Sequence, residues 1–67
     1  ALQPRYNRVI LAWSQGDTAT ARTHLTALGN LTKGDARAAA YITDLLADLK
    51  AGKTPAESRI DAKGFDP

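Results

Sequence analysis

Two stretches of this chain decide its fold: QGDTATARTHL at residues 15–25 and KGDARAAAYIT at residues 33–43. Each contains a Gly-Asp pair, followed by small residues that lead into large apolar ones. Glycine readily adopts the left-handed conformation that ends a helix, and an aspartate beside it can cap the next helix. We therefore interpret both stretches as turns between packed helices, and Gly52 as a third helix end of the same kind.

The residues around the first turn repeat with helical spacing. In residues 4–15 the apolar side chains recur at i, i+3, i+4 and i+7, namely Tyr6, Val9, Ile10 and Trp13. In the second segment the same spacing gives Ala21, His24, Leu25 and Leu28. We expect Asp17 or Thr18 to cap this second helix, Gly29-Asn30 to end it, and Leu31 to cover the helix ends.

The third segment has the strongest helical pattern and should run over residues 36–50, with Asp35 as its cap. Its apolar stripe is Ala38, Tyr41, Ile42, Leu45, Leu46 and Leu49. Downstream, Thr54 and Glu57 have the spacing of a capping box. This pattern predicts a short fourth helix over about 55–62, with Ala56 and Ile60 facing inward, and an extended tail over 63–67.

These elements predict an all-α fold: a small antiparallel bundle of three main helices plus a short C-terminal helix, forming one domain over residues 1–67. The expected core is Ile10, Trp13, Leu25, Leu28, Ile42, Leu45 and Leu49. A chain of 67 residues buries only about 60 % of the surface that its unfolded form exposes, and it has no cysteine to cross-link it. Packing and helix caps must therefore supply the stability.

With the first two helices placed, residues 5–28 resemble a tetratricopeptide-type helical hairpin. Gly16-Asp17 would be its turn and Ala21 the small residue that lets the helices approach closely. The chain departs from the family pattern at Val9, where a small residue is usual, and its glycines recur after eighteen residues instead of about 34. The resemblance implies a helical interaction module.

No residue set forms a catalytic or cofactor-binding constellation. His24 is the only histidine and has no second metal ligand at helical spacing, so we interpret it as a partly buried edge residue. Asp44 and Asp48 share a helix face, which we interpret as solvated because no acidic loop would complete a cation site. We expect no enzyme activity, no cofactor or metal, and no small-molecule substrate.

The wide apolar stripe of residues 36–50 points to a protein-binding function. If neighbouring helices leave part of it uncovered, it forms a patch for a protein partner or a second copy. The candidate partner-binding residues are Tyr41, Leu45, Leu46, Leu49 and Phe65. The sequence has no apolar run long enough to span a bilayer, and it assigns no compartment.

The alternative is a nucleic-acid-binding domain of the helix-turn-helix kind. Basic residues interleaved with aromatic ones can contact phosphates and stack on bases. The candidates are Arg5, Arg8 and Arg22, near Tyr6 and Trp13. The net charge of +2 is modest for this function, and the two aromatic residues lie on the apolar stripe of their helix.

Overall fold

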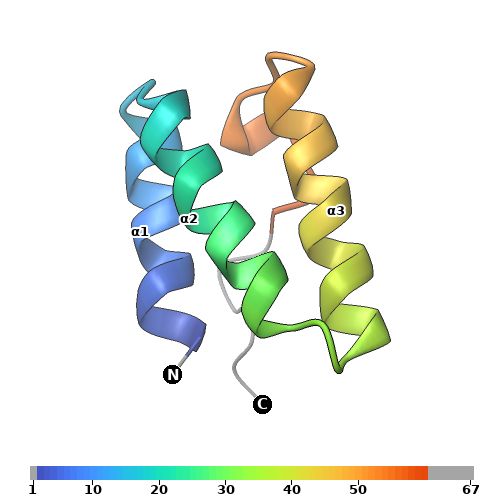
Figure 1. Cartoon of the computed structure of the whole chain (residues 1–67). Helices are drawn as coiled ribbons and strands as arrows, with labels where there is room; N and C mark the ends of the chain where they lie inside the picture. The colour runs from blue at the N-terminus through green and yellow to red at the C-terminus, as the bar shows by residue number, and fades with distance from the viewer. Residues whose placement is uncertain (1, 61–67) are drawn as a thin grey trace.

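The computed structural model describes residues 2–60, and these form three α-helices and one turn of 3-10 helix. Helix α1 runs over Leu2–Ser14, α2 over Thr18–Leu31 and α3 over Ala36–Lys50, while η1 covers Pro55–Glu57. Successive helices are antiparallel, and α2 packs against both α1 and α3 (Figure 1). The predicted all-α bundle of three main helices is confirmed, and residues 2–60 contain no strand.

Two helices end in the same glycine motif. Gly16 and Gly52 have φ angles of +78° and +80°, in the left-handed region that glycine adopts without steric cost. After α1, the Asp17 N–H donates to the Ala12 carbonyl at 2.9 Å; after α3, the Lys53 N–H donates to the Asp48 carbonyl at 3.2 Å. This is the Schellman pattern, which satisfies carbonyls at a helix end while reversing the chain.

Aspartates cap the two helices that follow the Gly-Asp pairs, as the sequence predicts. The Asp17 carboxylate accepts a hydrogen bond from the Thr20 N–H at 3.2 Å. The Asp35 carboxylate accepts from the N–H groups of Arg37 and Ala38, at 3.1 and 3.2 Å. Each cap satisfies amide groups that have no partner within the helix.

The end of α2 differs from the prediction. The helix passes through Gly29 and continues to Leu31, where the buried Thr32 donates its hydroxyl to the Leu28 carbonyl at 2.8 Å. Gly34 has no positive φ, so the turn between α2 and α3 is not a third copy of the glycine motif. Leu31 does not cover the helix ends, since its side chain is 62 % exposed.

The core contains side chains from all three helices. The buried hydrophobic residues are Tyr6, Val9, Ala12, Trp13, Ala21, Leu25, Leu28, Ile42, Leu45 and Leu49. Six of the seven predicted core residues are among them, and the seventh, Ile10, is partly buried against the cluster. Ala21 is fully buried, as the close packing of α1 against α2 requires.

Residues 53–60, which we call the return segment, form only the first turn of the predicted fourth helix, as 3-10 helix over Pro55–Glu57. The Glu57 carboxylate accepts from the Thr54 N–H at 2.9 Å, as a capping box requires, but the helical turn ends at Glu57. It ends because the Arg59 N–H donates to the Asp48 carboxylate on α3 instead of to a carbonyl one turn earlier. Ala56 is exposed, whereas Ile60 packs against the core as predicted. Residues 61–62 of the expected helix, and the expected tail over 63–67, lie outside the described residues.

Candidate functional site

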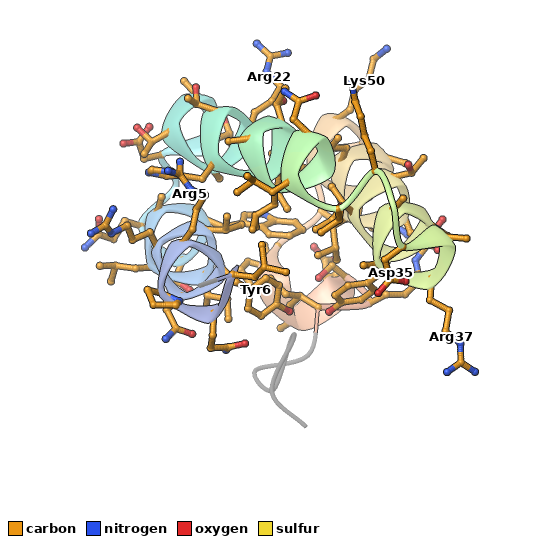
Figure 2. The ribbon with its side chains drawn as sticks, turned by 60° about the horizontal axis from the view of Figure 1, so that its bottom comes forward. Arg5, Tyr6, Arg22, Asp35, Arg37 and Lys50 are labelled. Carbon is orange, nitrogen blue, oxygen red and sulfur yellow. The ribbon has the colours of Figure 1, made fainter. Side chains whose placement is uncertain are left out.

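The return segment bridges two helices, α1 and α3, whose backbones do not approach each other closely. No Cα atom of α1 lies within 8 Å of a Cα atom of α3. In the end-on view of Figure 2 the return segment lies on the side of the bundle opposite α2, between α1 and α3. We call the surface of α1 and α3 that holds it the segment site, defined by Trp13, Tyr41, Asp44 and Asp48.

Asp48 is the centre of the segment site. Its side chain is only 3 % exposed, and its carboxylate accepts three hydrogen bonds, all from Arg59. The backbone N–H and the side-chain Nε of Arg59 donate to Oδ2 at 3.1 and 3.2 Å, and Nη2 donates to Oδ1 at 2.7 Å. Lys53 adds an ion pair at 3.5 Å. The paired side-chain donors form the two-pronged contact that matches a guanidinium to a carboxylate.

Asp44 extends this contact by one helical turn. Its Oδ1 lies 3.5 Å from Arg59 Nη1, and its backbone carbonyl lies 3.4 Å from Arg59 Nη2. The Asp44 carboxylate is half-exposed, so its attraction for the guanidinium is screened by solvent. Asp44 therefore contacts the guanidinium only weakly, and the buried Asp48 is its main binding partner.

Trp13 anchors the other end of the return segment. The buried indole donates its Nε1–H to the carbonyl of Lys53 at 2.8 Å. A pair of tyrosines lies between the two anchors: the hydroxyl oxygens of Tyr6 and Tyr41 are 2.7 Å apart, and Tyr41 donates to the Arg59 carbonyl across 3.5 Å. Figure 2 shows Tyr6 directed from α1 into the space between α1 and α3. Backbone and side-chain groups of the return segment are thus both bound.

The hydrogen bonds shift the ionisation of these groups. The Arg59 side chain and its N–H hold the pKa of the Asp48 carboxyl far below its usual value, and the same contacts raise the pKa of Arg59. The backbone N–H of Thr54 lowers the pKa of Glu57. Both carboxyls are therefore ionised at neutral pH, and the segment site is negatively charged where it meets Arg59.

The predicted partner-binding residues are not gathered on one exposed patch. Leu45 and Leu49 are buried in the core, and their role in partner binding stays a prediction. Tyr41 and Leu46 are partly exposed and pack against the core, and Phe65 lies outside the described residues. The apolar stripe of α3 is covered because α2 and the return segment contact it from two sides.

Asp48 differs from the sequence prediction, in which its shared face with Asp44 is solvated. Asp48 is in fact buried at 2 % exposure. Its position between Leu45 and Leu49, on the apolar stripe of the helix, was the available signal. A charged residue on such a stripe needs a partner of opposite charge, and that partner, Arg59, is eleven residues away on another element.

The predicted nucleic-acid residues lie on two helices, Arg5 and Arg8 on α1 and Arg22 on α2. Arg5 of α1 donates from Nη1 to Nδ1 of His24 on α2 at 3.4 Å, so this arginine spans the α1–α2 contact and His24 is the predicted partly buried edge residue. Arg8 is exposed on α1. Figure 2 shows Arg22 projecting from α2 on the same side as Lys50 of α3, and both line a hollow of about 270 Å³.

A second hollow, of about 300 Å³, lies beside the segment site where the turn after α1 meets the turn after α3. It is lined by Trp13 and Gly16 from the first turn and by Gly52, Lys53 and Pro55 from the second. One wall is therefore the buried indole that anchors the return segment. The hollow is large enough to take a side chain that lies next to this anchor.

Within residues 2–60 no group of three or more histidine, cysteine or acidic side chains could hold a metal ion. None of the described helices combines the length and apolar character needed to cross a bilayer. Comparisons with protein-family models, with curated proteins and with solved structures found no match for this chain.

Proposed function

We propose that this chain is a non-enzymatic protein-binding module whose binding surface is the segment site, where it takes an irregular peptide segment of a partner. The observation that carries the proposal is the choice of hydrogen-bond partners by two buried polar side chains. Within residues 2–60, the hydrogen bonds of the Trp13 indole and the Asp48 carboxylate all go to Lys53 and Arg59, and none goes to α1, α2 or α3. These two groups are arranged to bind a segment that lies across the bundle.

The kinds of contact at the site match peptide recognition. Trp13 on α1 and Tyr41 on α3 donate hydrogen bonds to backbone carbonyls of the return segment, and any peptide offers such carbonyls. The Asp48 carboxylate binds the side chain of Arg59, and only some peptides carry a side chain of this kind. Binding of a partner segment would therefore combine sequence-independent backbone contacts with one selective contact, a combination used by other peptide-binding surfaces.

The resemblance of residues 5–28 to a tetratricopeptide-type hairpin supports the same proposal, since it implies an interaction module. The chain reverses at the left-handed Gly16 between α1 and α2, and Ala21 is buried. The hollow beside Trp13 adds a place for a side chain of the partner.

The test is binding of a peptide in trans. The probe is a fluorescently labelled peptide with the sequence of residues 53–60, KTPAESRI. The receptor is the full chain with Arg59→Ala, whose own return segment has lost its main side-chain anchor. If circular dichroism shows that this variant is unfolded, Arg59→Lys replaces it as the receptor. We expect saturable anisotropy binding that is abolished by adding Trp13→Phe and Asp48→Asn together. Absence of saturable binding to either folded receptor contradicts the proposed function.

Nucleic-acid binding remains the alternative, and the same protein distinguishes it. Arg22 and Lys50 line one hollow on an outer face, and a single pair of cations gives few phosphate contacts. A module of this kind would bind labelled DNA or RNA with an affinity that falls steeply with salt. Loss of that binding in an Arg5→Ala/Arg8→Ala/Arg22→Ala variant, with no binding of the peptide, would favour the alternative over our proposal.

A further inference from the structure

We infer that the segment site is selective for arginine: it takes a partner segment whose arginine side chain enters between Asp48 and Asp44, and Arg59 of the chain itself competes for the same place. This inference rests on the proposed function and specifies the partner. The site would accept the guanidinium on two carboxylates and one backbone carbonyl, all from α3.

The geometry of Asp48 favours arginine over lysine. Two nitrogens of one side chain, Nε and Nη2, donate to the two separate oxygens of one carboxylate at 3.2 and 2.7 Å. A third nitrogen, Nη1, faces Asp44. An ammonium group is a single point that cannot make this paired contact, and Lys53, the lysine beside the same carboxylate, stays at 3.5 Å.

The burial of Asp48 makes the contact selective. The carboxylate is almost fully enclosed, and no group of the helices within residues 2–60 donates a hydrogen bond to it. A segment with an uncharged side chain at this position would still offer its backbone N–H and the ion pair of Lys53, but the buried carboxylate would lose both guanidinium hydrogen bonds. The partner segment that fits therefore carries arginine, followed by an apolar residue in the place of Ile60, which packs against the core.

The return segment acts as an intramolecular competitor. It is joined to α3 through Ala51 and Gly52, so its effective concentration at the site is in the millimolar range. A partner must displace it, and the affinity that is measured for the wild-type chain includes this competition. In this competition the return segment would leave the site by a change of backbone conformation at Gly52, which has a left-handed φ.

The experiment compares peptides on the full-chain Arg59→Ala receptor: KTPAESRI and the same peptide with R59K or R59A. We expect the arginine peptide to bind about tenfold or more tightly than either variant, because it alone makes the paired contact. Adding Asp48→Asn to the receptor should remove most of this preference, while Asp44→Asn should reduce it only slightly. The wild-type chain should bind the arginine peptide about tenfold or more weakly than the Arg59→Ala receptor.

The possible outcomes separate the two proposals. Equal binding of the three peptides would overturn arginine selectivity and leave the proposed function intact. Equal affinity of the wild-type and Arg59→Ala chains would show that the peptide binds elsewhere, and would overturn both. If Arg59→Ala does not fold, the comparison is made on Arg59→Lys, where the same order of peptides is expected. A dimer formed by exchange of return segments would appear as a concentration-dependent increase in mass of the wild-type chain, and a peptide unable to dissociate it would contradict the inference.

Discussion

The indole Nε1 of Trp13 donates a hydrogen bond to the backbone carbonyl of Lys53 at 2.8 Å, and so fixes the start of the return segment to α1. Both residues lie beside a left-handed glycine turn, Trp13 before Gly16 and Lys53 after Gly52. The two helix ends are thereby tied together, although α1 and α3 have no direct backbone contact. This relationship explains why a side chain of the first helix controls a segment near the other end of the chain.

Replacing Trp13 with Phe should lower stability while keeping the fold. The change removes the indole donor and part of a buried ring, and we expect a loss of about 1–3 kcal/mol in the free energy of unfolding. Urea unfolding followed by circular dichroism measures it. Trp13 is the only tryptophan, so its emission in the wild-type chain reports whether the indole is covered. An unchanged midpoint would mean that the bond to Lys53 contributes little.

Acid should destabilise the folded chain, and Asp48 should account for much of the loss. The folded-state pKa of Asp48 lies below its unfolded value of about 3.9, so the folded chain binds fewer protons in this range. Its contribution is therefore fully present above about pH 5 and is lost as the pH falls through about 4 toward the folded-state pKa. Glu57 and Asp17, whose pKa values are also lowered, add to the same slope.

Melting temperatures measured between about pH 6 and pH 2 test this assignment. We expect the wild-type chain to lose stability steeply in this range. Asp48→Asn should be less stable at neutral pH and should show a flatter profile, because its amide does not titrate. Asp44→Asn is the matched control, since this half-exposed carboxylate faces the same arginine without being buried. Parallel wild-type and Asp48→Asn profiles would assign the acid loss to other groups.

Two glycine substitutions should have opposite effects. Gly29 lies inside α2, where an added Cβ would meet Ile42 Cγ2 at 3.5 Å, an ordinary van der Waals contact. Gly29→Ala should therefore stabilise the chain by about 0.5–1 kcal/mol, the helix-propensity difference. Gly52→Ala should destabilise it by about 1–2 kcal/mol, because its φ of +80° is unfavourable for a residue with a Cβ. Chemical denaturation of both variants tests the pair, and a stabilising Gly52→Ala would contradict the role of this turn.

Two leucines three residues apart on α2 should differ sharply. Leu28 is fully buried, so Leu28→Ala should cost about 2–5 kcal/mol, enough to unfold much of so small a domain. Leu31 is 62 % exposed, and Leu31→Ala should change stability by no more than about 0.5 kcal/mol. Thermal melts followed by circular dichroism compare them. A large effect at Leu31 would indicate that its exposed side chain is covered by a second molecule.

The sequence by itself determined the three main helices, because their boundaries are local chemistry. The left-handed Gly16 and Gly52 and the caps at Asp17 and Asp35 depend only on neighbouring residues. The apolar spacing also predicted most of the core. The end of α2 differs from the prediction because glycine usually marks a helix end, and Gly29 does not. The helix continues for two more residues, and the hydroxyl of Thr32 then satisfies the Leu28 carbonyl.

Only the tertiary structure decided the fate of the return segment and of Asp48. A capping box at Thr54 predicts how a helix begins and says nothing of where it ends. The helix stops at Glu57 because Arg59 finds a buried carboxylate on α3, a contact between residues eleven apart that no local pattern encodes. The same contact converts Asp48 from an expected surface charge into the centre of the candidate site. Local sequence fixes backbone conformation within a turn or two, while the burial of a charge depends on which distant group arrives to pair with it.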